Sequence, residues 1–117
     1  MTEMLTVGSG DAARQIAYIA RPGAAPGLFW LNGYRSDMLG TKAQTVDAFG
    51  AARGLAVTRF DYSGHGQSGG DFLEGTLTRW LDESLAVFAT TSRRCRSVAH
   101  SRSRGVSLPY KSAYRAA

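Results

Sequence analysis

The order of the predicted secondary-structure elements constrains this chain most, and that order stops before the sequence ends. The sequence contains four short apolar runs typical of strands and two amphipathic runs typical of helices. Their order is strand, strand, strand, helix, strand, helix. Such an order predicts an α/β fold, a sheet with crossover helices. After Thr91 the periodicity is lost, so this order of elements stops early.

The predicted strands cover residues 4–7, 16–20, 28–31 and 55–60. The first two are joined by a turn over residues 8–11, and a loop over residues 22–27 precedes the third. The third and fourth are continuous apolar runs, which are typical of strands covered on both faces.

Two helices are predicted from their apolar stripes. For the first, Thr41 is the expected N-cap and Gln44 completes a capping box. Its inward stripe is Ala43, Val46, Phe49 and Ala51 or Ala52, with Gly54 as the stop. For the second, Thr76 is the expected cap. Its inward stripe is Leu77, Trp80, Leu81, Ser84, Leu85 and Phe88, which leaves Arg79, Asp82 and Glu83 outside.

Charge divides the chain into two parts. Residues 1–92 carry seven basic and nine acidic side chains, whereas residues 93–117 carry seven basic and no acidic ones, consistent with the net charge of +5. We therefore expect a domain over residues 1–92 and a basic tail over residues 93–117. The tail is predicted to be disordered, because it cannot bury enough apolar area to offset its ordering entropy.

Cysteine usage bounds the chemistry. Cys95 is the single cysteine, so an intrachain disulfide and a thiol metal cluster are not expected, and a cytoplasmic location is the default. The first residues carry an early acid and no long apolar run, unlike a secretory signal. The sequence shows no metal-ligand spacing, and no cofactor is predicted.

Two phrases carry a family resemblance. The first is LNGYRSDM at residues 31–38, followed by GTKA at residues 40–43, and the second is RFDYSGHGQSGGDF at residues 59–72. Together they resemble the α/β-hydrolases related to mycophenolic acid acyl-glucuronide esterase and palmitoyl-protein thioesterase, over roughly residues 27–91. The resemblance implies the amino-terminal half of an α/β-hydrolase sheet. It also implies serine-dependent, cofactor-free hydrolysis of small-molecule or acyl-protein esters or thioesters.

The resemblance implies one site residue. The backbone N–H of Tyr34 would be an oxyanion-hole donor, and Gly33 before it would allow the turn. The second donor would follow the nucleophilic serine, and no residue of this sequence fills that place. No nucleophile is therefore assigned, and the chain is predicted to be a truncated, catalytically incompetent hydrolase.

Residues 66–70 satisfy G-x-S-x-G, the pattern of a nucleophile elbow. The context argues against that role, because the preceding strand ends near Asp61 and the residues after Ser68 are a poor helix start. We expect Ser68 and Asp61 to hydrogen-bond nearby main chain, and His65 to be a loop residue packed near the pocket.

Other candidate residues have structural or incidental interpretations. Asp82 and Glu83 are expected to form a solvated helix face. His100 is expected to be a solvated histidine, and Cys95 an incidental thiol between arginines.

Three interpretations of the tail remain open. A frameshifted or rearranged reading frame is favoured, because the family pattern fails abruptly after Phe88. A basic arm that binds nucleic acid or an anionic membrane is the alternative, non-enzymatic function, although no motif indicates a specific nucleic-acid partner. A terminus that merely caps the fold is the third. In each case we expect residues 28–31 to form an exposed apolar sheet edge, with marginal stability and self-association as consequences.

Overall fold

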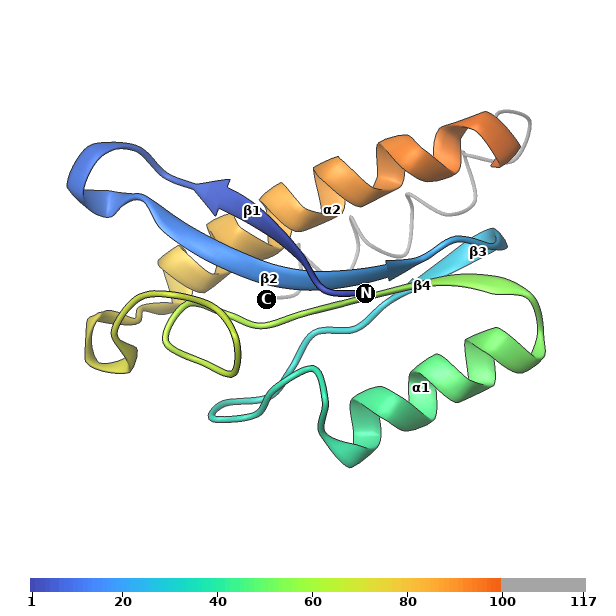
Figure 1. Ribbon diagram of the computed structural model, residues 1–117, viewed down its shortest axis with the longest axis horizontal. Helices are drawn as coiled ribbons and strands as arrows, with labels where there is room; N and C mark the ends of the chain where they lie inside the picture. The colour runs from blue at the N-terminus through green and yellow to red at the C-terminus, as the bar shows by residue number, and fades with distance from the viewer. Residues whose placement is uncertain (100–117) are drawn as a thin grey trace.

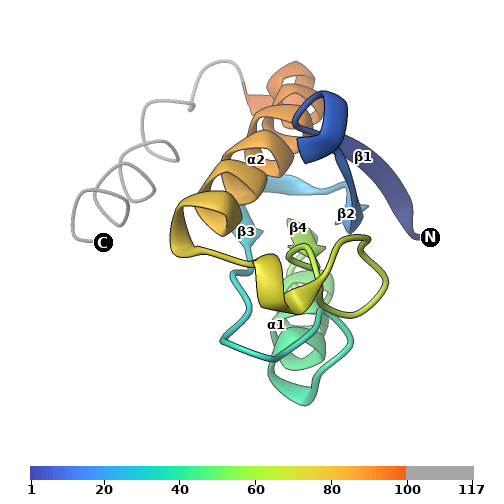
Figure 2. The same cartoon turned by 90° about the vertical axis from the view of Figure 1, so that its left-hand side faces the viewer.

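The computed structural model describes the backbone of residues 1–99 and the side chains of residues 1–92. A four-stranded mixed sheet lies between two helices, one on each face (Figures 1 and 2). The strands are β1 (Glu3–Val7), β2 (Arg14–Arg21), β3 (Ala24–Phe29) and β4 (Leu55–Phe60). The helices are α1 (Thr41–Ala52) and α2 (Leu77–Ala99), with short 3-10 turns η1 (Gly10–Ala12) and η2 (Phe72–Glu74). The predicted α/β fold is confirmed.

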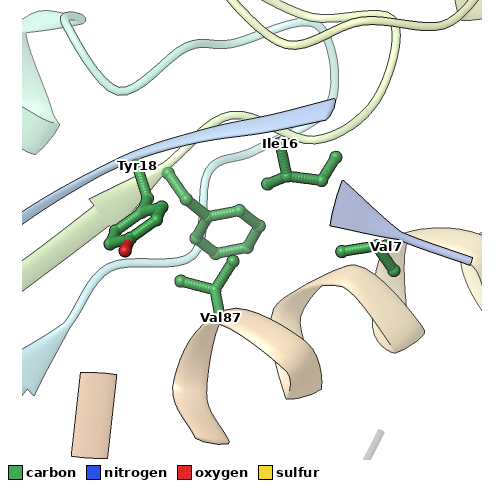
Figure 3. Packing of buried hydrophobic residues seen from close by; sticks show 5 residues of the cluster. Val7, Ile16, Tyr18 and Val87 are labelled. Carbon is green, nitrogen blue, oxygen red and sulfur yellow. The ribbon is translucent and has the colours of Figure 1, made fainter. Parts of the chain in front are cut away.

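The sheet order is β1-β2-β4-β3, with β1–β2 and β2–β4 antiparallel and β3–β4 parallel. The core cluster comprises Val7, Ile16, Tyr18, Phe60 and Val87, contributed by three strands and α2 (Figure 3). The bounds of β4 are those predicted from its apolar run.

β3 differs from its prediction. It begins at Ala24 and ends at Phe29, so the loop predicted over residues 22–27 is wrong from Ala24 onward. Within the described sheet β3 is an edge strand, where Pro26 is tolerated because no strand pairs with its outer side. A register shift between Ala24 and Leu28 accommodates the irregularity.

α1 begins one residue earlier than predicted, at the residue that was expected to cap it. Gly40 is the N-cap, Thr41 is already helical, and no side chain caps the helix. The Gln44 side chain instead donates to the carbonyl of Leu39 at 2.6 Å, so the predicted capping box is wrong. The predicted inward stripe also differs, since Ala43 and Gly50 are buried whereas Phe49 is 48% exposed.

α2 is capped as predicted, because the hydroxyl of Thr76 accepts a hydrogen bond from the Arg79 N–H at 3.1 Å. Its inward face, however, is rotated from the predicted one. Its buried residues are Glu83, Ser84, Val87 and Thr91, whereas Leu77, Leu81 and Leu85 are exposed. The apolar stripe misled the prediction because Arg14 on β2 draws Glu83 inward.

The helix continues through Ala99, past the boundary predicted between residues 92 and 93. The rest of the predicted tail, residues 100–117, lies outside the described residues. Within the part of the chain that the structure describes, neither helix is long and apolar enough to cross a membrane.

Candidate functional site

Two loops meet at the carboxyl ends of β3 and β4. The β3–α1 loop (residues 30–40) and the post-β4 loop (residues 61–71) lie at the same end of the sheet (Figures 1 and 2). Parallel pairing of β3 and β4 brings these ends together. The Asn32 side chain donates to the carbonyl of Phe60, and the Arg59 guanidinium donates to the carbonyl of Met38 at 2.7 Å. The β3–α1 loop is thus fastened to β4 near both of its ends.

Asp61 joins the two loops. Its buried carboxylate accepts from the Met38 N–H at 2.7 Å and from the Gln67 N–H at 2.9 Å. Burial raises the pKa of Asp61, and the two N–H donors oppose that rise. Gly66 turns beneath this carboxylate with φ +48, and a Cβ at that position would collide with it. As expected, Asp61 hydrogen-bonds nearby main chain.

Tyr34 lies on a turn with an open donor. The Ser36 N–H donates to the carbonyl of Gly33 at 3.1 Å and closes the turn. The Tyr34 side chain is 69% exposed and lies against Phe72 and Trp80, with ring centroids 5.4 and 6.1 Å away. Its backbone N–H makes no hydrogen bond to the described residues. An unpaired N–H on a fastened turn is the type of group that an oxyanion hole uses.

His65 is buried at the junction of the loops, as predicted for a packed loop residue. Its ring contacts those of Tyr62, Phe72 and Trp80, with centroids 5.2 to 6.0 Å apart. Beside it is a cavity of about 200 Å³. The cavity is lined by Arg35, Ser36, Asp37, Gly64, His65, Gly66 and Phe72.

The hydroxyl of Ser68 is engaged by main chain on both sides. It donates to the carbonyl of Asp61 at 2.6 Å and accepts from the Ala17 N–H at 2.8 Å. β4 has ended at Phe60, and no helix begins at Ser68. The predicted structural bonding of Ser68 is therefore confirmed. The residue fastens the post-β4 loop to β2.

Glu83 is a structural residue that sequence reasoning missed. Its carboxylate accepts from the Arg14 Nε at 2.9 Å, the Ser63 N–H at 2.6 Å and the Ser63 hydroxyl at 2.7 Å. It is fully buried, so the predicted solvated position is wrong for Glu83, whereas Asp82 is exposed as expected. Helical periodicity cannot reveal the Arg14–Glu83 pair, because the two residues are 69 positions apart in the sequence.

Two sequence candidates lie apart from this site. Cys95 is on the last part of α2, where only the backbone is described, and His100 is outside the described residues. Among the residues whose side chains are described, no group of three or more His, Cys, Asp or Glu is placed to hold a metal ion.

Comparison with known proteins shows that part of this chain shares an ancestor with a thioesterase. No family model matches the chain. Palmitoyl-protein thioesterase ABHD10, mitochondrial, from Homo sapiens is 42% identical over 72 residues, which cover 62% of this chain and 24% of that protein. The N-terminal portion of this chain is homologous to that thioesterase.

Solved structures agree. A protein from Agrobacterium vitis S4 named as a hydrolase matches with TM-score 0.75 and 52% identity, over 77% of this chain and 36% of that chain. The α/β hydrolase domain-containing protein 10 from mouse matches with TM-score 0.65 and 34% identity, over 74% of this chain and 34% of that chain. The chain thus spans about a quarter of the length of the curated relatives it matches.

Proposed function

We propose that this chain carries the oxyanion-loop half of a serine hydrolase that cleaves carboxylic esters or thioesters of small molecules or acylated proteins. The observation that carries the proposal is the Tyr34 N–H, open on a turn within the stretch that resembles the thioesterases. In such an enzyme a serine forms an acyl-enzyme, a histidine moves the proton, and backbone N–H groups stabilise the tetrahedral oxyanion.

We propose that the chain by itself does not hydrolyse these substrates. The Ser68 hydroxyl is engaged by main chain, and His65 uses both ring nitrogens in hydrogen bonds to Ser63 and Arg35. Neither arrangement matches a nucleophile beside its general base. A serine-reactive fluorophosphonate probe applied to the folded chain should leave Ser68 unlabelled, and stoichiometric labelling would contradict this proposal.

A chimera tests the proposed hydrolase half directly. Residues 1–91 of this chain would replace the matching segment of the Agrobacterium vitis protein, to which the chain is 52% identical. Hydrolysis of a short-chain thioester by the chimera, at a rate similar to that of the parent, is the expected result. A folded chimera without activity, beside an active parent, would contradict the proposed function.

Within the chimera, Tyr34→Pro should lower kcat by about 10²- to 10³-fold, because one oxyanion donor contributes that much. Proline removes the N–H yet suits the second position of this turn. Tyr34→Ala is the matched control, since it loses the exposed ring and keeps the donor. Equal activity of the two variants would show that the N–H is not used.

The basic tail supports a second candidate, a non-enzymatic module that binds nucleic acid or an anionic membrane. The seven cations of residues 93–117 carry this alternative. Since α2 continues to Ala99, deletion should start at residue 100, which removes Arg102, Arg104, Lys111 and Arg115 and keeps the helix. Salt-sensitive binding to DNA or anionic vesicles that is lost on deletion would favour this candidate.

Two further parts of the proposal concern context. We propose a cytoplasmic location, to be tested by fractionating cells that express the tagged chain; the human relative is named as mitochondrial, so recovery in mitochondria would contradict it. We also propose that the chain self-associates along the β3 edge.

A further inference from the structure

The turn that presents the Tyr34 N–H has an unfavourable backbone. Arg35, its third residue, has φ +58, and it is the one non-glycine residue with positive φ among those described. Turns of this kind favour glycine at that position, since a Cβ there is strained. Such a conformation persists only where surrounding contacts determine it.

One such contact is the buried imidazole of His65. The Arg35 backbone N–H points at the Nε2 of His65, 3.3 Å away, while Nδ1 lies 3.0 Å from the carbonyl oxygen of Ser63. The amide can only donate and the carbonyl can only accept. Nε2 must therefore be the unprotonated nitrogen, and Nδ1 must carry the hydrogen.

We propose that His65, as the neutral Nδ1–H tautomer, is the positioning residue that holds Arg35 in its left-handed conformation and so aims the adjacent Tyr34 N–H. This inference rests on the proposed function for its catalytic meaning. Ser63 in turn is fastened by Glu83, which accepts from both its N–H and its hydroxyl. The orientation of the turn is thereby linked through His65 and Ser63 to α2.

Protonation of Nε2 would place two donors face to face and release the turn. The charged groups around His65 are Arg35, whose guanidinium lies 4.9 Å above the Phe72 ring, Asp37 on the same cavity wall, and the buried Asp61. Tyr62, Phe72 and Trp80 supply only rings on the remaining sides. The ring signal of His65 must be followed together with the Arg35 amide, so that an effect of these carboxylates on the amide is not taken for an effect of the imidazole.

The wild-type chain gives the first test, by nuclear magnetic resonance. At pH 8 a long-range ¹H–¹⁵N spectrum should show His65 protonated on Nδ1 alone. On acidification the Arg35 amide proton should shift upfield with the midpoint of the His65 ring, while the Trp30 amide, bonded to the Thr58 carbonyl at 2.9 Å, stays constant. The opposite tautomer would overturn the proposal. So would an Arg35 amide chemical shift that stays constant while the His65 ring signal changes.

A pair of variants separates hydrogen bonding from packing. His65→Phe keeps a ring among its aromatic neighbours and removes the acceptor. Tyr62→Leu removes a ring contact with a centroid distance of 6.0 Å and keeps the acceptor. In His65→Phe we expect Arg35 amide exchange to rise about tenfold and its coupling constants to leave the left-handed range. In Tyr62→Leu both should stay near wild type. Equal changes in the two variants would mean that His65 only packs, which overturns the proposal.

The tautomer of His65 and the shift and exchange of the Arg35 amide can be measured without any enzymatic activity. An inactive chimera would remove the proposed function and leave the tautomer and the Arg35 amide as described. If His65→Phe does not fold, the wild-type titration alone decides the proposal.

Discussion

At the scale of single residues, the Arg14–Glu83 pair connects β2, α2 and the post-β4 loop. Arg14 also donates to the carbonyls of Ala12 and Arg79, at 3.0 and 3.3 Å. The pair is satisfied on all sides. Buried charges of this kind contribute little when intact, but removal of one partner leaves the other desolvated and alone.

Glu83→Ala should therefore lower the free energy of unfolding by about 3–5 kcal/mol, enough to unfold a marginal domain. Asp82→Ala, which removes the neighbouring exposed acid, should change it by less than about 0.5 kcal/mol. Urea denaturation followed by circular dichroism measures both. Similar curves for the two variants would contradict the buried pair.

Gly66→Ala should destabilise the chain by more than Gly10→Ala. Both glycines have positive φ, +48 and +56, so an alanine is strained at either. Only at Gly66 would the new Cβ meet the Asp61 carboxylate; at Gly10 it would meet open space. The strain alone costs about 1 kcal/mol. The difference between the melting temperatures of the two variants measures the cost of the collision with Asp61. Equal melting temperatures would show that the Asp61 carboxylate moves aside without a measurable cost.

At the scale of elements, α1 rests on the sheet through small residues and one charge cluster. Gly50 packs against the Val57 side chain of β4, which brings the helix close. Asp47 accepts from Arg21 of β2 at 3.0 and 2.6 Å, and Arg59 of β4 lies 3.7 Å away. The hydrogen bonds from Arg21, aided by the charge of Arg59, lower the pKa of Asp47 against an opposing effect of burial.

This shift makes the attachment of α1 pH-dependent. A lowered pKa means stability that is present above the ordinary aspartate pKa and is lost as pH falls through the lowered value. Because Arg21 is 45% exposed, we expect Asp47→Asn to cost only about 0.5–1 kcal/mol at pH 7, and less near pH 3. Asp11→Asn, an exposed acid without an ion pair in the described region, should cost nothing at either pH. A constant Asp47→Asn effect across this range would contradict the assignment.

At the scale of the whole molecule, several large apolar side chains remain in water. They include Leu31 at 41%, Leu73 at 86%, Leu77 at 82% and Leu85 at 44% exposure. β3 is an edge of the described sheet, and its outer side offers backbone groups to another strand. Pro26 and the register shift partly blunt that edge.

We therefore expect concentration-dependent oligomers in sedimentation velocity, reduced by Leu31→Lys in the loop two residues past the end of β3. Leu73→Lys makes the same chemical change on η2, away from β3, and should leave the oligomers in place. If both variants dissociate them equally, general apolar exposure and not the β3 edge drives association.

The sequence by itself determined the α/β class, the existence of each strand and helix, the bounds of β4, the Thr76 cap and the structural bonding of Ser68. These depend on signals within a few neighbouring residues, such as apolar runs, cap residues and the distance from a strand end to a glycine. The tertiary structure alone decided which faces of α1 and α2 turn inward, that β3 extends across Pro26, and that Glu83 is buried. Each of these depends on how the elements pack in three dimensions: on Val57 of β4 against Gly50 of α1, on the edge position of β3 in the sheet, and on Arg14, 69 residues from Glu83. The residues next to Glu83 in the sequence do not indicate that it is buried, because its burial depends on the opposite charge of Arg14 in the folded structure.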